Sequence, residues 1–311
     1  MAKSLIVYFS LGGTTARVSE SIATGLRTAE HRVDLCNIKD EQPPGLDGYD
    51  LLGIGAPAYY FRPPFNVMDY VNSLHHLDGL PAFVFVLHGT YRGDAGNAMR
   101  QALAQKGTQE AGYFCCYGAD FFLSYLKEGY LFSPDHPTAE ELTRAEEFGR
   151  EVAGRIAGQE YTRPKYDPPP AIVYRMERFL LNRWLVKQVY SRLFRVNGNK
   201  CVACGLCREQ CPTGNITEDK EGCPVWGHNC LLCLNCEMQC PEDAITSPVS
   251  WSLFRSTMMY NVRQASRDPS LDHVRVKHSQ GRTQRVQAVA SSEQVSHMNE
   301  KGLRPTNLTK G

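Results

Sequence analysis

Eight cysteines stand in two runs that share one spacing, C-x2-C-x2-C-x3-C followed by proline, with the second run starting twenty-nine residues after the first. The first run holds Cys201, Cys204, Cys207 and Cys211, and the second holds Cys230, Cys233, Cys236 and Cys240. Three thiolates spaced by two residues can occupy three corners of a cubane iron–sulfur cluster, and the fourth ligand must arrive from elsewhere. In the two-cluster bacterial arrangement, the fourth cysteine of each run ligates the other cluster.

This spacing predicts two [4Fe–4S] clusters with crossed ligands. Cluster 1 takes Cys201, Cys204, Cys207 and Cys240, and cluster 2 takes Cys230, Cys233, Cys236 and Cys211. Ile216-Thr217 and Ile245-Thr246 extend the repeat beyond the cysteines. Zinc is the first alternative, although structural zinc sites usually use C-x2-C pairs with longer spacers. Disulfides are the second, and they need an oxidising compartment.

Four further cysteines lie outside the two runs. Cys36, Cys115 and Cys116 fall in apolar, strand-like stretches, and we expect them to be buried, inert thiols. Cys223 lies between the two runs, and a bystander role is favoured over a spare ligand or a redox-sensitive thiol.

Residues 1–160 alternate between short apolar runs and amphipathic segments. Five runs read as strands buried on both faces: 4–10, 32–37, 49–58, 82–89 and 113–122. Four segments read as helices: 15–29, 64–74, 95–106 and 138–157. This alternation predicts an α/β fold with a doubly wound, five-stranded parallel sheet, in which ligands bind at the carboxyl ends of the strands.

Three loops at that edge of the sheet predict a binding site for a flat, phosphorylated ring. The first loop is short and rich in glycine and hydroxyls, which suits an anion at a helix N-terminus, although it is neither a P-loop nor a G-x-G-x-x-G motif. The other two follow the third and fourth strands and carry tyrosines that can stack on a ring. The candidate FMN-binding residues are Ser10, Gly12, Gly13, Thr14, Thr15, Pro57, Ala58, Tyr59, Tyr60, Gly89, Thr90, Tyr91, Gly93 and Asn97.

Residues 1–160 resemble a flavodoxin, and residues 1–249 as a whole resemble the flavodoxin–ferredoxin fusion proteins of anaerobes. The flavodoxin phosphate loop usually reads S/T-x-T-G-x-T after an aromatic strand end. Here the loop keeps Ser10, Gly13 and Thr15, and it departs at Gly12, where Thr14 is the substitute hydroxyl. Residues 124–149 also look typical of these fusions. The resemblance implies a flavodoxin-like domain that binds FMN, followed by a small α+β 2[4Fe–4S] ferredoxin-like domain.

The expected organisation has four parts: 1–160, the flavodoxin-like domain; 161–197, a Pro-rich linker and a basic helix; 198–249, the ferredoxin-like domain; and 250–311, a polar, flexible extension. Residues 171–196 lack Gly and Pro and predict one helix with a broad apolar face and a net charge of +5. We expect it to brace the two domains, with peripheral membrane contact or an acidic partner as alternatives. Residues 263–311 carry nine basic and four acidic side chains without aromatics, which favours flexibility.

Composition excludes several classes of protein. The net charge of +1 gives no global basic excess for nucleic acid, and no apolar stretch is long enough for a transmembrane helix. The first apolar run, 5–9, is too short for the core of a signal peptide, so a cytoplasmic location is expected. The oligomeric state cannot be predicted.

The combination predicts an intracellular iron–sulfur flavoprotein that carries low-potential electrons between FMN, two [4Fe–4S] clusters and a redox partner. A flavin-dependent reductase of a quinone or another small acceptor, fed through the clusters, is the alternative. An FMN-free redox sensor or assembly factor is the second alternative, and the departure at Gly12 keeps it open. No residue is predicted to be catalytic, since His88, Tyr91 and Asp94 fit binding or structural roles better.

Overall fold

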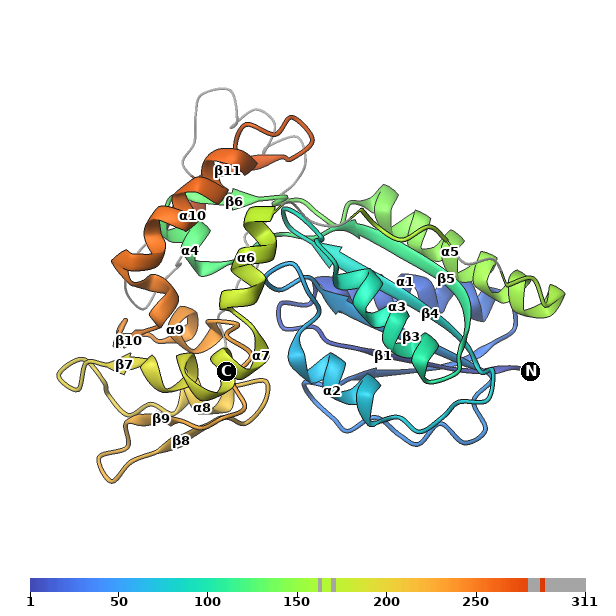
Figure 1. Ribbon diagram of the computed structural model, residues 1–311, viewed down its shortest axis with the longest axis horizontal. Helices are drawn as coiled ribbons and strands as arrows, with labels where there is room; N and C mark the ends of the chain where they lie inside the picture. Colours follow the sequence, from blue (N-terminus) through green and yellow to red (C-terminus); the bar gives the residue numbers. More distant parts are fainter. Residues whose placement is uncertain (162–163, 169–171, 279–285, 289–311) are drawn as a thin grey trace.

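The computed structural model describes residues 1–161, 164–168, 172–278 and 286–288. Two lobes lie side by side (Figure 1). The N-terminal lobe is a layered α/β unit, and the other lobe holds the cysteine runs together with the helices that flank them. Among the described residues, no helix is both long enough and apolar enough to cross a membrane.

The N-terminal lobe is built on a parallel sheet with strand order β2-β1-β3-β4-β5. Its strands are β1 (Lys3–Tyr8), β2 (Arg32–Asn37), β3 (Leu51–Pro57), β4 (Pro81–His88) and β5 (Gln109–Tyr117). This is the flavodoxin-like, doubly wound order, so the predicted fold class is confirmed. The fifth strand starts earlier than expected, at Gln109, and ends at Tyr117.

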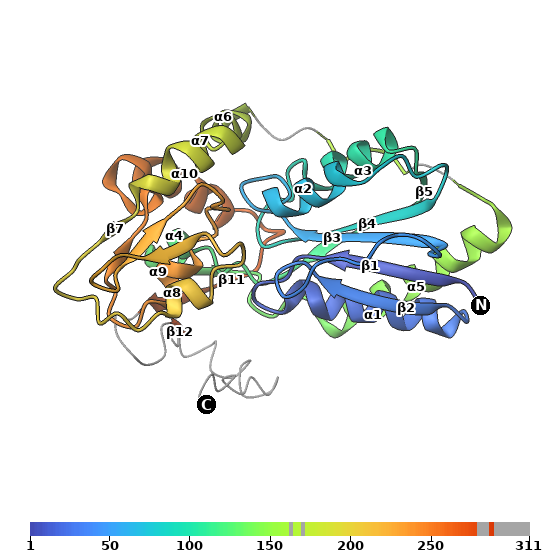
Figure 2. The same ribbon diagram turned by 90° about the horizontal axis from the view of Figure 1, so that it is seen from below.

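Helices cover both faces of this sheet (Figure 2). They are α1 (Thr14–Thr28), α2 (Phe65–Ser73), α3 (Ala95–Gln105) and α5 (Ala139–Gly158). The buried side chains of α1 and α5 share one core with Phe83 and Phe85. Those of α2 and α3 share the opposite core with Val84 and Val86. Successive residues of β4 therefore point to opposite faces, and both faces are apolar, as expected for a buried parallel strand.

The cluster lobe is a pair of similar small units. Its elements are β7 (Arg195–Val196), α8 (Leu206–Glu209), β8 (Ile216–Glu218), β9 (Pro224–Trp226), α9 (Asn235–Gln239) and β10 (Ile245–Thr246). The repeated Ile-Thr pairs begin β8 and form β10, which pair antiparallel with β9 and β7. The two copies of the cysteine repeat therefore have similar backbone structures.

The single helix predicted for 171–196 is wrong. The chain instead forms α6 (Ile172–Leu180), α7 (Arg183–Gln188), the 3-10 turn η1 (Tyr190–Leu193) and β7. Asn182 starts α7 by accepting a hydrogen bond from the amide of Leu185 at 3.0 Å. The guanidinium of Arg62 donates to the carbonyl of Leu181. Both contacts supply partners to backbone groups that lose their intrahelical bonds at the break, and so they stabilise it.

The expectation of a flexible extension from residue 250 also needs correction. The turn η2 (Pro248–Ser250) leads into α10 (Ser252–Ala265), followed by β11 (His273–His278), which also pairs with β12 (Val286–Ala288). Strand β11 pairs antiparallel with β6 (Tyr130–Phe132), beside α4 (Leu123–Lys127). Leu271 and Val276 are about 5% exposed, so this segment buries apolar surface against the N-terminal lobe. Residues 279–285 and 289–311 of the predicted extension lie outside the described residues.

Candidate functional site

The structure brings the fourth cysteine of the second run to the first run. Cys240 lines one cavity together with Cys201, Cys204 and Cys207, which we call the distal set. Burial, with a smaller effect of the nearby thiols of Cys204 and Cys240, raises the pKa of the Cys207 thiol to about 11. In the described part of the chain, no three His, Cys, Asp or Glu side chains converge on one ion-sized point. The four cysteines that the spacing predicts for cluster 1 thus line one cavity, as a shared cluster would require.

The other four ligand candidates gather in the same crossed manner. We call Cys211, Cys230, Cys233 and Cys236 the proximal set. Burial, with a smaller effect of the nearby Cys211, raises the pKa of Cys230 to about 12 and that of Cys233 to about 11. Free thiols here are protonated at neutral pH, and they must lose protons to ligate iron. Bound iron would lower the pKa values of these thiols instead of raising them.

The two runs share backbone details that suit ligand loops. The residues on either side of the second cysteine of each run lie in the left-handed region. Ala203 and Leu232, directly before it, have φ of 51° and 57°, and Gly205 and Leu234, directly after it, have φ of 74° and 60°. The amides of Asn215 and Ala244 donate to the sulfurs of Cys211 and Cys240, each at 3.3 Å. Such amide–sulfur bonds stabilise thiolates and tune cluster potentials. The arrangement fits two cubanes, although the ligand set itself stays a prediction.

Of the three cysteines outside the runs that we expected to be buried, two are buried and Cys115 is not. Cys36 and Cys116 are buried, Cys115 is half-buried, and burial raises the pKa of Cys36 to about 11. Cys223 instead sits beside a distal ligand, because its thiol hydrogen-bonds with Cys201, which raises its pKa. It is therefore a neighbour of the distal set rather than part of the four thiols that line the cavity.

The loop before α1 is an open cradle at a helix N-terminus. Ser10 Oγ accepts hydrogen bonds from the amides of Gly13 and Ala16, both at 3.2 Å, which shapes the loop. A Cβ added at Gly12 or Gly13 would meet nothing within 4 Å, and Gly13 has φ of 88°. Within the described residues, the amides of Thr14 and Thr15 have no hydrogen-bond partner. Unpaired amides at a helix N-terminus suit a phosphate, so this loop fits FMN.

The predicted ring-stacking tyrosines contact protein groups. Tyr59 stands edge-on to Phe9, with ring centroids 6.1 Å apart. Tyr60 packs edge-on against Phe122 and donates to the carbonyl of Leu232 at 2.9 Å. Both rings therefore lie where the N-terminal lobe meets the proximal set, and burial raises the pKa of Tyr59, with Cys233 adding to the rise.

Tyr91 contacts α6 and the turn after α10 instead of the proximal set. Its hydroxyl donates to Asp268 at 3.0 Å, and its ring lies 5.6 Å from that of Tyr174 on α6. Tyr91 thus ties the fourth-strand loop to α6 and to the turn after α10.

Of the remaining predicted FMN residues, those in the loops after β3 and β4 lie at the predicted edge of the sheet, and Asn97 is engaged elsewhere. Ala58 follows Pro57 at the end of β3, and its amide donates to Leu87. Gly89, Thr90 and Gly93 follow β4, and Gly93 packs against Phe61 of the preceding loop. The side-chain amide of Asn97 is not available to a ligand. Its Nδ2 donates to the carbonyl of Asp167, and its Oδ1 accepts a hydrogen bond from the amide of Asp167, each at 3.0 Å. Asn97 therefore anchors the linker.

Sequence reasoning missed a carboxyl group beside these loops. Asp120 sits against Gly89, where an added Cβ would come within 2.1 Å of Asp120 Cβ. Burial raises the pKa of Asp120 to about 6, although hydrogen bonds from the amide of Phe122 and from Thr90 oppose the rise. Gly-Ala-Asp at a strand end carries no signal that distinguishes it from an ordinary turn.

His88 is a second titratable group at this edge, and it is neutral near pH 7. Burial lowers the pKa of His88 to about 4. Its Nδ1 lies 3.0 Å from the carbonyl of Thr90, so Nδ1 carries the proton and Nε2 is left as an acceptor.

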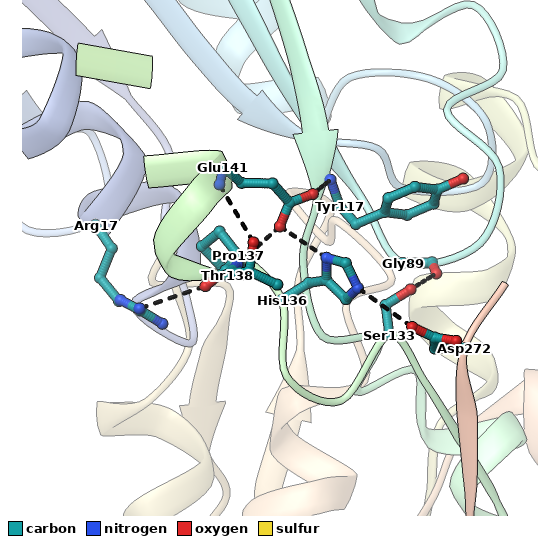
Figure 3. Close-up of polar contacts among 9 residues, drawn as sticks. All are labelled: Arg17, Gly89, Tyr117, Ser133, His136, Pro137, Thr138, Glu141 and Asp272. Carbon is teal, nitrogen blue, oxygen red and sulfur yellow. Dashed lines mark hydrogen bonds and ion pairs between the residues drawn. The ribbon is translucent and has the colours of Figure 1, made fainter. Parts of the chain in front are cut away.

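A polar cluster holds the start of α5 against the loop after β4 (Figure 3). Glu141 accepts hydrogen bonds from the amides of Tyr117 and Thr138 at 3.1 and 2.7 Å, and His136 Nδ1 lies 2.7 Å from it. Thr138 and Glu141 form a capping box. Ser133 donates to the carbonyl of Gly89 at 2.7 Å. The carboxylate is fully engaged in this capping, so the cluster positions the loop and is not free for chemistry.

A cavity of about 460 Å³ opens beside the same edge of the sheet. Thr90, Tyr91 and Gly93 line it, together with residues from β5, α5 and α6 that include Cys115, Tyr117, Arg144 and Tyr174. None of residues 10–15 lines it. The cavity therefore adjoins the second and third predicted loops and is separate from the phosphate cradle.

Comparison with family models assigns both lobes. Residues 5–125 match the model of the flavodoxin domain, and residues 194–217 match that of the 4Fe-4S binding domain. The second match covers the first cysteine run.

Individual relatives match the N-terminal half. An uncharacterized protein of Methanocaldococcus jannaschii is 26% identical over 153 residues, which cover 48% of this chain and 97% of that protein. A flavodoxin structure from the domain Archaea is 16% identical and covers 50% of this chain and 99% of its own, with a TM-score of 0.39. Oxidised flavodoxin 1 of Bacillus cereus is 18% identical and covers 49% and 98%, with a TM-score of 0.38.

The family models imply FMN in the first lobe and 4Fe-4S chemistry in the second, where the cradle and the thiol sets fit these groups. The chain joins a flavodoxin domain to a 4Fe-4S ferredoxin domain, and it is an iron–sulfur flavin electron-transfer protein.

Proposed function

We propose that low-potential electrons pass between the flavin site and an external redox partner, in anaerobic metabolism, through two [4Fe–4S] clusters in series. FMN supplies a carrier that exchanges two electrons, and each cubane supplies a carrier for one. The residues of the chain would hold these groups in the order FMN, proximal cluster, distal cluster. The observation that carries the proposal is the hydrogen bond from Tyr60, in a flavin-site loop, to Leu232, between two proximal cysteines.

The proximal set, which lies nearer the flavin site, is surrounded by buried residues. Leu231, Leu232 and Leu234 are each at most 4% exposed, and they belong to the same apolar core as Phe65 and Val67 of the N-terminal lobe. Packing of this kind holds two sites at a fixed separation and excludes water between them. The proximal set is therefore the cluster site placed to exchange electrons with the flavin.

The outer end is open. Cys204 is exposed, and its neighbours Val202 and Leu206 are 55% and 37% exposed. Exposed apolar side chains around a ligand loop suit a transient contact with a protein partner. We propose that electrons enter or leave at this distal end.

The first test is cofactor content after strictly anaerobic purification. Iron, acid-labile sulfide and flavin are measured on one sample, and the proposal requires two cubanes for each FMN. Full clusters without flavin would overturn the route and leave a ferredoxin with a flavin-free lobe.

The second test separates the two cluster sites. We expect Cys211→Ala and Cys240→Ala each to remove about half of the iron, because each takes a ligand from a different set. Flavin should then exchange electrons with the remaining cluster in Cys240→Ala and lose that exchange in Cys211→Ala. Rapid photoreduction followed at the flavin absorption band measures the rate, and the far-UV spectrum checks folding. Equal rates in both variants would contradict the order.

The cavity beside Tyr91 supports a second candidate function, the reduction of a small acceptor near the flavin. It is large enough for a small molecule and is lined by tyrosines and Arg144. Turnover with a soluble quinone that does not depend on the distal set would favour this candidate. Dependence on a protein acceptor and on Cys240 would favour the carrier.

A further inference from the structure

Helices α6 and α7 turn their apolar side chains outward. Met176 and Phe179 are 64% and 73% exposed, Leu180 is 49% exposed, and Trp184 at the start of α7 is 66% exposed. The first three are spaced i, i+3, i+4, so they share one face of α6. We call these four residues the outer apolar patch. Both helices lie along an outer side of the molecule (Figure 2).

The inward face of α6 carries polar groups beside Tyr174, whose ring stacks on that of Phe61. Glu177 is 9% exposed and accepts a hydrogen bond from Asn261 at 3.0 Å, and burial raises its pKa. Arg178 pairs with Asp94 at 3.1 Å. A carboxylate inside and a phenylalanine outside reverse the usual pattern of a surface helix.

These polar contacts fix the rotation of the helix. Rotating α6 to bury Phe179 would expose Glu177 and would separate Glu177 and Arg178 from their partners. It would also move the carbonyl of Leu181 away from Arg62. Leaving a buried charge without its partner is costly. The outward orientation of the outer apolar patch is therefore built into the packing.

The charge around the patch is basic. Glu177 is the one acidic residue in 172–196, and it is buried, whereas six residues of this stretch are basic. Asp69 of α2 pairs with Arg183 and with Lys187. Arg175 is exposed, and it has no ion-pair partner among the described residues. A symmetric contact between two copies would place these basic groups against each other, which disfavours a homodimer through this patch.

We propose that α6 and α7 dock onto a lipid bilayer that contains anionic lipids. The aromatic and aliphatic side chains of the outer apolar patch enter the boundary between headgroups and acyl chains, and the arginines lie at the level of the phosphates. Trp184 suits this boundary because its ring is apolar and its N–H can stay with the headgroups. The inference rests on the surface alone and does not depend on the electron route.

Vesicle co-sedimentation of the full chain tests the proposal. Purified protein is mixed with phosphatidylcholine vesicles and with phosphatidylcholine–phosphatidylglycerol vesicles. We expect stronger sedimentation with the anionic vesicles, weakening at high salt. Phe179→Ala/Trp184→Ala should lower the partition coefficient at least about tenfold, because it removes two of the inserted rings. Arg175→Glu should weaken binding to the anionic vesicles selectively.

The matched control is Phe121→Ala/Val225→Ala, which removes two apolar side chains, each 46% exposed, from other surfaces. This control should bind vesicles like the wild type. Cluster absorption and far-UV spectra confirm that each variant is folded. Absence of sedimentation with anionic vesicles, or equal sedimentation of the two double variants, would overturn the proposal. So would sedimentation velocity that shows a wild-type dimer converted to a monomer by Phe179→Ala/Trp184→Ala.

Discussion

At the scale of single residues, the flavin edge of the sheet holds two half-buried titratable groups whose pKa values shift in opposite directions. Asp120 has its pKa raised to about 6 and His88 has its pKa lowered to about 4, both by burial. Each therefore keeps the neutral form over a wider pH range than in the unfolded chain. A neutral lining is what a planar ring requires of its surroundings, because uncompensated charge beside an apolar ring costs free energy.

The Asp120 carboxyl makes a testable contribution to stability. Its folded pKa of about 6 lies above the unfolded value, so the folded chain binds a proton that the unfolded chain does not between about pH 4 and pH 6. The resulting stability is fully present below about pH 4 and is lost as the pH rises through 6. Asp120→Asn should remove this dependence and be more stable than the wild type above pH 6, by up to about 3 kcal/mol.

Denaturant unfolding of both proteins at a series of pH values measures the effect. His88 is present in both proteins, so its opposite dependence cancels in the difference. A difference in unfolding free energy that stays constant from pH 4 to pH 8 would contradict the raised pKa of Asp120.

At the scale of elements, α1 and α5 cross with their backbones in contact. A Cβ added at Gly25 would lie 2.0 Å from the carbonyl oxygen of Glu146, and one added at Gly149 would lie 2.2 Å from that of Ile22. The phosphate cradle opens at the start of α1, so this crossing sets the position of the cradle relative to the sheet.

Gly25→Ala should therefore destabilise the protein by about 1–3 kcal/mol, since the new methyl group meets backbone that cannot move aside without separating the helices. Gly154→Ala is the control on α5, where an added Cβ meets nothing within 4 Å. That substitution should stabilise by up to about 1 kcal/mol, because alanine is the better helix former. Thermal unfolding of the two variants side by side gives the comparison, and equal shifts would refute the close crossing.

The elements that the sequence predicts well are those whose signal is local. The apolar runs at 4–10 and 82–89 become buried strands because both faces are covered, and the cysteine spacing encodes its own loops. Strand β11 could not be predicted, since Val274 and Val276 stand in a polar stretch and become a strand by pairing with β12 and with β6, which is distant in the sequence. The break at Leu181 depends on Arg62, far away in the sequence. Asn97 and Asp120 likewise acquire their roles from distant partners.

At the scale of the whole molecule, the chain leaves the flavodoxin lobe, builds the cluster lobe and then returns. The return is made by α10 and β11, and it is fixed by the pairing of β11 with β6 and by an ion pair between Arg255 and Glu128 at 2.9 Å. The cluster lobe is therefore held at both of its ends.

A chain that stops after Ser266 tests this double attachment against one that stops after His278. Only the second keeps β11, and both lack the residues that follow it. We expect electron exchange between flavin and clusters to slow with added glycerol in the shorter chain, because its cluster lobe can move away from the flavin site. In the longer chain the rate should not respond to viscosity. The same response in both chains would show that the packing around Tyr60 alone holds the lobes.

The pairing of β6 with β11 also bears on how the molecule is made. Its two strands are separated by nearly half of the chain, so they close a long loop whose ends meet only after the cluster lobe has been synthesised. Contacts of such long range form late in folding. During synthesis, β6 therefore gains its partner β11 only after both cysteine runs have emerged, and the pairing of β11 with β6 then closes this loop.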